Sequence, residues 1–256
     1  MADDNTAITG KKIFFIHPSV FVQNEIVPEL AQQELEVYIA KDEEKLRKVL
    51  VKYPDSIVFA CIDEILPAAK WETWIRSIMG AESTINIKMG VLSNTNNEAS
   101  RRLYLQTLQV PCGFIPIKLE KARVIKTLTD ILNAVEAKGL RKFIRADTSN
   151  ETMTTINVPH GGAYITGKIR DVSVVGLSCV FSEDPELDKN SLLNDIQIKL
   201  QSILIKAEAI VFGSRMNEEE KIYVLVFTQK VDPSIRSKIR TYIQKNMQSK
   251  MNEELR

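Results

Sequence analysis

The residues in this chain that are best suited to binding chemistry form two short patterns. Arg141 and Arg145 make an RxxxR pattern, and Asp171, Ser173 and Gly176 make a DxSxxG pattern. Guanidinium groups form forked hydrogen bonds to phosphate oxygens and to the O6/N7 edge of guanine, and they also stack on base planes. An ionised aspartate only accepts hydrogen bonds, which suits the N1–H and N2–H2 donors of guanine. The two patterns thus offer groups that suit phosphates and guanine bases.

The backbone around these residues decides whether they can act together. An RxxxR pair places both guanidinium groups on one side of a helical turn, or within reach of each other in a loop. Ser173 supplies a small hydroxyl for phosphate or base, and Gly176 permits close backbone approach and a positive φ at the turn. Each pattern alone has a simpler explanation, as a solvated helix face or as a turn stabilised by Asp or Ser. Their joint occurrence favours binding.

Together, in this order and spacing, the two patterns resemble the signature of PilZ domains, the bacterial receptors for cyclic di-GMP. All five positions match residue by residue. The resemblance covers roughly residues 139 to 248. It implies a six-stranded barrel with a closing C-terminal helix, and a cyclic di-GMP site lined by these five residues. Leu140 departs from the pattern, because some relatives have another cation there, and this bears on whether one nucleotide or a stacked pair binds.

The hydrophobic pattern of the C-terminal half also predicts a barrel. From Thr152 onward, strand-like runs follow one another without intervening helices, which indicates a closed or nearly closed antiparallel six-stranded barrel. Asp232 and Pro233 are then typical of the N-cap and first position of a helix that covers the barrel's end. The six runs are Met153–Val158, Ala163–Val172, Leu177–Phe181, Ile196–Leu200, Leu204–Phe212 and Ile222–Thr228.

The first 138 residues alternate strand-like and helix-like segments, which predicts an α/β doubly wound parallel sheet of five strands. Asp42 is placed to cap a helix, whereas Pro28 weakens the helical pattern over residues 22 to 33. Trp71 and Trp74 lie on another predicted helix, where they either pack in the core or form an exposed patch for a partner. The strand candidates are Lys12–His17, Leu35–Ala40, Ile57–Ile62, Ile87–Leu92 and Gly113–Ile117.

This half resembles the receiver domain of response regulators. Asp63 follows the third strand, where receivers carry a phosphoacceptor aspartate, and Pro67 stands four residues later. Ser93 matches the usual hydroxyl, but the metal-binding acids are missing after the first strand, and Ile115 precedes Pro116 where receivers have a lysine. Because phosphoryl transfer needs a metal and a neutralising cation, we expect a degenerate receiver used for docking or dimerisation. A simpler explanation is that Asp63 only caps the following loop.

Composition and charge narrow the class of protein. A formal net charge of +1 argues against a broad electrostatic grip on nucleic acid, and no apolar run is long enough to span a bilayer. The cysteines are far apart and include no CxxC pair, so we expect small buried hydrophobes rather than a zinc site or disulfides. No catalytic or metal-binding constellation is visible. The N-terminus lacks a signal-peptide pattern, so we expect a cytoplasmic protein. Because no catalytic constellation is visible, we also expect that the protein is not an enzyme.

The sequence thus predicts a receiver-like domain over residues 1–138 and a PilZ-like barrel domain over residues 139–256. We expect an effector that binds cyclic di-GMP and thereby changes its interdomain geometry. The output would be altered contact with a protein partner in the motility, envelope or signalling machinery, and a homodimer through the receiver-like domain stays open. Two alternatives also stay open: a regulator that is phosphorylated on Asp63, and a PilZ-like adaptor that binds no nucleotide.

Overall fold

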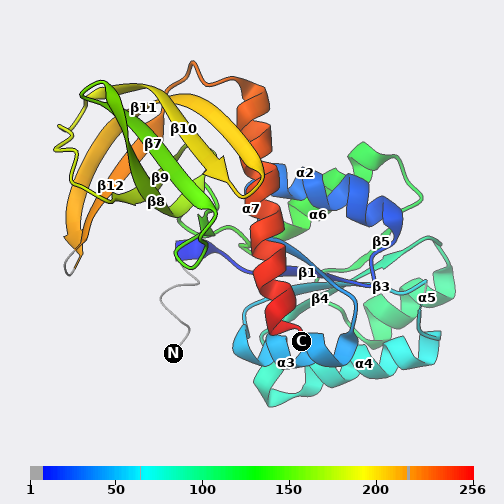
Figure 1. Cartoon of the computed structure of the whole chain (residues 1–256). Coiled ribbons are helices and arrows are strands. Elements are labelled where there is room, and N and C mark those ends of the chain that lie inside the picture. The colour runs from blue at the N-terminus through cyan, green and yellow to red at the C-terminus, as the bar shows by residue number, and fades with distance from the viewer. Residues whose placement is uncertain (1–7, 64, 218–219) are drawn as a thin grey trace. The chain divides into compact units, whose positions relative to one another are not determined.

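The computed structural model describes residues 8–63, 65–217 and 220–256 (Figure 1). Its contacts divide the chain into two units, which are Met1–Lys142 with Met247–Arg256, and Phe143–Asn246. The last helix, α7 (Pro233–Glu254), contributes residues to both units. The predicted domain boundary between residues 138 and 139 stays a prediction. Among the described residues, no helix is long and apolar enough to cross a membrane.

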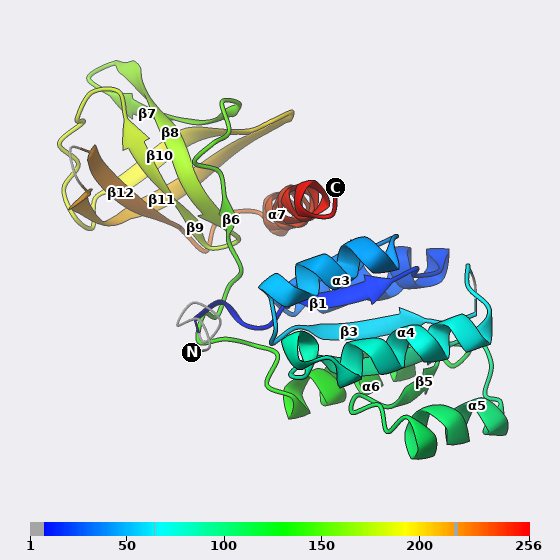
Figure 2. The same cartoon turned by 90° about the horizontal axis from the view of Figure 1, so that it is seen from below.

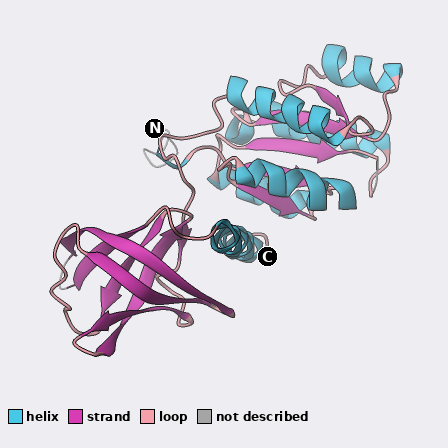
Figure 3. Ribbon diagram, turned by 90° about the horizontal axis from the view of Figure 1, so that it is seen from above, coloured by secondary structure: helices cyan, strands magenta, loops and turns pink. Residues whose placement is uncertain are grey.

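The first unit contains the predicted five-stranded parallel sheet, in the order β2-β1-β3-β4-β5. All of its neighbouring strands pair in parallel, and each strand lies inside its predicted apolar run or passes its end by one residue. Figure 3 shows helices on both sides of these strands. This confirms the α/β class expected for the N-terminal half. The strands are β1 (Ile13–Ile16), β2 (Val37–Ala40), β3 (Ile57–Cys61), β4 (Lys88–Ser93) and β5 (Phe114–Pro116).

The two faces of this sheet carry separate hydrophobic clusters. Phe14 and Ile16 of β1 belong to one cluster, while Ile13 and Phe15 belong to the other, because successive side chains of a strand point to opposite faces. The first cluster also includes Met251 of α7. The helical segments of the unit are η1 (Val22–Ile26), α2 (Val27–Gln32), α3 (Glu43–Lys52), α4 (Ala68–Gly80), η2 (Glu82–Thr84), α5 (Glu98–Arg102), η3 (Leu103–Thr107) and α6 (Lys121–Ala134).

The local signals for helices had mixed outcomes. The predicted cap is confirmed, since Asp42 Oδ1 accepts hydrogen bonds from the backbone N–H groups of Glu44 (3.0 Å) and Lys45 (2.9 Å). Pro28 does not end the helical run, since η1 leads directly into α2 and Pro28 is the second residue of α2. Trp71 and Trp74 are 0% and 5% exposed, so the core explanation is confirmed and the exposed patch was wrong.

The second unit contains the predicted antiparallel barrel. Six strands follow the order β8-β7-β10-β11-β12-β9, and a further pairing of β8 with β9 closes the ring. The short strand β6 pairs with the end of β8. Figure 2 shows these strands curving around a common axis. The strands are β6 (Ala146–Asp147), β7 (Thr154–His160), β8 (Ala163–Ser173), β9 (Gly176–Phe181), β10 (Leu192–Leu200), β11 (Ile203–Asn217) and β12 (Glu220–Phe227).

Helix α7 makes contacts within each unit. Its N-terminal half buries Ile239, Tyr242 and Ile243, and the Tyr242 hydroxyl donates to Glu151 Oε2 at 2.9 Å. These contacts lie within the barrel unit. The last turns belong to the first unit, where Met251 is 3% exposed and joins the hydrophobic cluster described above.

Candidate functional site

The DxSxxG pattern forms the hairpin between β8 and β9. Ser173 ends β8, Gly176 begins β9, and the two residues pair across a two-residue turn. The Ser173 side chain is buried, and its hydroxyl donates to the Gly176 carbonyl oxygen at 3.1 Å. The same hydroxyl oxygen accepts from the backbone N–H of Val175 at 3.4 Å. Ser173 therefore stabilises the turn in this structure.

Gly176 is required at the hairpin for a steric reason. The predicted positive φ was wrong, since the glycines with positive φ among the described residues lie elsewhere in the chain. A Cβ built on Gly176 would instead lie 2.2 Å from the carbonyl oxygen of Leu225, far inside any normal contact. The close backbone approach that the sequence suggested is therefore present, and it is an approach of β9 to β12 of the same barrel.

Asp171 is held by side chains on two sides. Its Oδ1 accepts from Arg145 Nη1 at 3.1 Å, and its Oδ2 accepts from the hydroxyl of Ser178. The side chains of Arg145 and Asp171 are 47% and 29% exposed, so their ion pair contributes only about 0–1 kcal/mol to stability. Each carboxylate oxygen of Asp171 thus accepts a hydrogen bond from another side chain. The donor to Oδ1, Arg145, is held only by a weak, exposed ion pair.

The RxxxR segment is a loop, the second of the two conformations considered for it. Arg145 directly precedes β6, and no helix is assigned between Arg141 and Arg145. The backbone N–H of Arg141 donates to the carbonyl of Ile8 at 3.0 Å, which ties this end of the loop to the first unit. The structure brings Arg145 to Asp171, and Ser173 to Gly176. Arg141 belongs to the other contact unit.

Two residues near the hairpin were missed by sequence reasoning. Ser178 faces Asp171 directly in the β8–β9 ladder, so it could have been found by extending the hairpin register from its turn. Arg236 of α7 donates from Nη1 to the carbonyl of Val174 (2.8 Å) and from Nη2 to that of Thr228 (2.9 Å). No sequence signal points to Arg236, because its acceptors are backbone carbonyls and the one in the hairpin, Val174 O, is 62 residues away in the chain.

The carboxyl ends of β3 and β4 hold the residues that the receiver resemblance singled out. The Ser93 hydroxyl donates to Asp63 Oδ1 at 2.8 Å, and the backbone N–H of Asn94 donates to Oδ2. Within the described ranges, no three His, Cys, Asp or Glu side chains are grouped to hold a metal ion. Asp63 therefore bonds to the end of β4 and the residue after it rather than to the loop that follows Asp63, and both explanations of this residue stay predictions.

The cysteines are buried, as the sequence predicted. Burial raises the pKa of Cys112 to about 11 and raises the pKa of Cys179 further. Their thiolates are therefore scarce at neutral pH, and these side chains act as small hydrophobes.

Comparison with known protein families finds a match in the C-terminal half of the chain. Residues 140–245 match the family model of the PilZ domain. The C-terminal half carries a PilZ domain. All five predicted site residues lie within the matched PilZ segment. No curated protein sequence matches the chain.

The chain is also similar to several solved structures. One is the PilZ domain with c-di-GMP of YcgR from Escherichia coli, at 10% identity, covering 44% of this chain and 96% of that one, with a TM-score of 0.38. A second is the MrkH–c-di-GMP complex of K. pneumonia, at 13% identity and a TM-score of 0.41, covering 46% of this chain and 57% of that one. A third is a response regulator protein from Burkholderia multivorans, at 15% identity and a TM-score of 0.37, covering 48% of this chain and 94% of that one. The chain thus spans little more than half the length of the MrkH chain.

Proposed function

We propose that the PilZ domain of this chain binds cyclic di-GMP and that the protein is a cytoplasmic, non-catalytic effector of this nucleotide. The observation that supports the proposal most is the match of residues 140–245 to the PilZ family together with the intact RxxxR and DxSxxG patterns inside it. Solved structures with cyclic di-GMP among the proteins similar to this chain include those of YcgR and MrkH. The N-terminal α/β unit would act as a receiver-like docking module.

We propose a role for each residue of the two patterns. Arg141 and Arg145 would give forked hydrogen bonds to the phosphates and to the guanine O6/N7 edges. Asp171 would accept from guanine N1–H and N2–H2 once Arg145 turns from Asp171 to the ligand. That exchange costs little, because the exposed ion pair contributes only about 0–1 kcal/mol. Ser173 and Gly176 would keep the hairpin in the conformation that presents Asp171.

The output would pass through the RxxxR loop and helix α7. Binding would order the loop that joins the two contact units, and this would change the angle between them. Arg236 fixes the first turns of α7 to the hairpin carbonyl of Val174, while Met251 and its neighbours at the other end belong to the α/β unit. The changed geometry would then alter contact with a protein partner in the motility, envelope or signalling machinery.

Calorimetric titration of the full chain with cyclic di-GMP tests the binding proposal. We expect saturable binding that Arg141→Ala and Arg145→Ala each weaken at least tenfold, since each removes charge-assisted hydrogen bonds. Lys138→Ala is the matched control, because Lys138 is an exposed cation just outside the motif and its removal should leave the affinity unchanged. Absence of saturable binding by the unaltered chain would refute the proposal, and so would equal affinities for Arg141→Ala and Lys138→Ala.

A further inference from the structure

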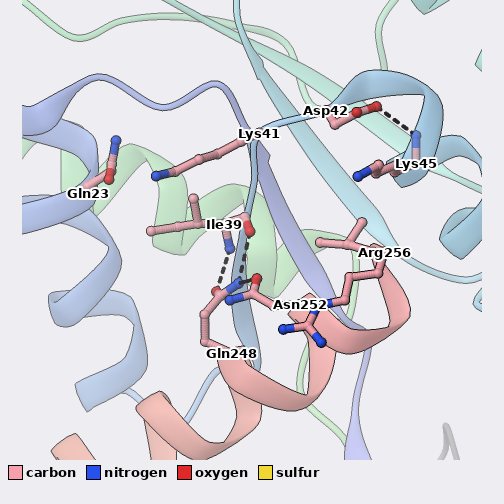
Figure 4. A pocket seen from close by; sticks show the side chains of 9 residues that line it. Gln23, Ile39, Lys41, Asp42, Lys45, Gln248, Asn252 and Arg256 are labelled. Atoms are coloured by element: carbon pink, nitrogen blue, oxygen red, sulfur yellow. Dashed lines mark hydrogen bonds between the residues drawn. The ribbon is translucent and has the colours of Figure 1, made fainter.

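A polar cavity lies in the first unit, and it is lined by none of the residues of the PilZ signature. It has a volume of about 470 Å³ and is lined by residues of η1, of β2 and the turn after it, of α3, and of the last turns of α7. Three cations line it, Lys41, Lys45 and Arg256, and three amides, Gln23, Gln248 and Asn252. Figure 4 shows Lys41 extending toward Gln23, Lys45 beside Asp42, and Arg256 beside Asn252. A volume of this size is in the range of small-molecule sites.

The amides of this cavity are held in fixed orientations. Gln248 pairs with the backbone of the edge strand β2, since its Oε1 accepts from Ile39 N (2.8 Å) and its Nε2 donates to Ile39 O (2.9 Å). Gln248 Nε2 also donates to Asn252 Oδ1 at 2.8 Å (Figure 4). The oxygen of Asn252 is thereby engaged, which leaves its NH2 group as the donor for a ligand.

The cations of the cavity are not neutralised by the protein. Throughout the described residues, the charged groups of Lys41, Lys45 and Arg256 form no ion pair with a carboxylate. The one carboxylate side chain in the lining, Asp42, accepts from the N–H groups of Glu44 and Lys45, so its charge is directed at the N-terminus of α3. Three cations and one engaged carboxylate side chain in the lining leave a positive potential that favours anions.

We propose that this cavity is a binding site for a small, multiply charged anion that carries phosphate groups. Lysine ammonium groups bind phosphate as point charges, and the guanidinium of Arg256 adds a forked donor. The lining residues include no aromatic side chain on which a base could stack. The site would therefore recognise the phosphate groups rather than a nucleobase, which separates it from the proposed cyclic di-GMP site. A bound anion would also link the end of α7 to β2 and α3 of the same unit.

Calorimetric titration of the full chain with sodium pyrophosphate, at constant ionic strength, tests this site. We expect saturable binding that the double variant Lys41→Gln/Lys45→Gln weakens at least tenfold, with Arg256→Gln weakening it to a smaller degree. Lys48→Gln is the matched control, because Lys48 is an exposed lysine of α3 that does not line the cavity. The Lys48→Gln variant should bind pyrophosphate with the affinity of the unaltered chain. Fluorescence of the buried tryptophans checks that the variants are folded.

Two further results separate this proposal from the binding of cyclic di-GMP. Arg141→Ala should keep the pyrophosphate affinity of the unaltered chain, and the Lys41→Gln/Lys45→Gln variant should keep its response to cyclic di-GMP. Pyrophosphate binding that is absent in the unaltered chain, unaffected by the double lysine variant, or lost in Arg141→Ala would overturn the proposed cavity site.

Discussion

The steric role of Gly176 gives a prediction whose size follows from the coordinates. In Gly176→Ala, the new Cβ would lie 2.2 Å from the Leu225 carbonyl oxygen, whereas ordinary contacts begin at 3.4 Å. The obstructing atom is backbone, so no side chain can rotate away, and β9 and β12 must separate by roughly 1 Å. That movement stretches the hydrogen bond from Phe227 N to Val175 O, which is 2.9 Å long.

The expected loss of stability combines two costs. Forced overpacking costs about 1–3 kcal/mol, and a weakened backbone hydrogen bond adds about 1 kcal/mol. We therefore expect Gly176→Ala to destabilise the barrel by about 2–4 kcal/mol. Gly213→Ala is the matched control, because Gly213 also lies in a barrel strand but a Cβ there meets nothing within 4 Å. Its effect should stay within about 0.5 kcal/mol.

Hydrogen exchange of β12 peptides, followed by mass spectrometry, measures this loss where it occurs. A loss of about 3 kcal/mol corresponds to exchange faster by roughly 100-fold at amides that exchange through opening of the barrel. The fluorescence of Trp71 and Trp74, which are buried in the first unit, reports separately that this unit is folded. Equal exchange of β12 in Gly176→Ala and Gly213→Ala would refute the steric reasoning and leave ligand contact as the reason for the glycine.

Three further substitutions test the surroundings of the site. Glu151→Ala should destabilise the barrel by about 1–3 kcal/mol in urea denaturation, because it leaves the buried Tyr242 hydroxyl without its acceptor. Glu151→Gln keeps an acceptor oxygen and should lower the stability of the barrel by less. The hydrogen bond from Tyr223 helps to lower the pKa of Asp184 from 3.8 to about 2. The ionised carboxylate therefore contributes stability above pH 3.8 that is lost as the pH falls toward 2. In an acid titration followed by circular dichroism, Asp184→Asn should lack this loss of stability between pH 3.8 and 2. Asp42→Ala should lower the stability of the first unit by about 1 kcal/mol, measured by tryptophan fluorescence in urea, since it removes the cap of α3.

Much of the fold could be predicted because the strands are apolar runs of the right length. The inner strands β1 and β3 are buried on both faces, and a continuous run such as Ile57–Cys61 is visible in the sequence without further context. The barrel strands were located less accurately, because bulges break the alternation of exposed and buried residues. The prediction began β10 at Ile196, where the ladder resumes after a bulge, whereas the strand begins at Leu192.

The site residues could be predicted as types and positions, but their contacts could not. The spacing of DxSxxG indicated a turn, and Ser173 does bond within it. The clash that fixes Gly176 comes from Leu225, about fifty residues later, and only the closed barrel brings them together. The contact of Arg236 with the Val174 carbonyl is equally remote in sequence. Such long-range backbone contacts depend on strand order and register, which local patterns do not encode.

The most direct test of the central proposal is hydrogen exchange of the full chain with and without saturating cyclic di-GMP. The proposal predicts slower exchange in the RxxxR loop, residues 141–145, and in the hairpin segment 171–178, with little change in the strands on the far side of the barrel ring. Unchanged exchange in both segments at saturating nucleotide would contradict it, and so would protection confined to other parts of the chain.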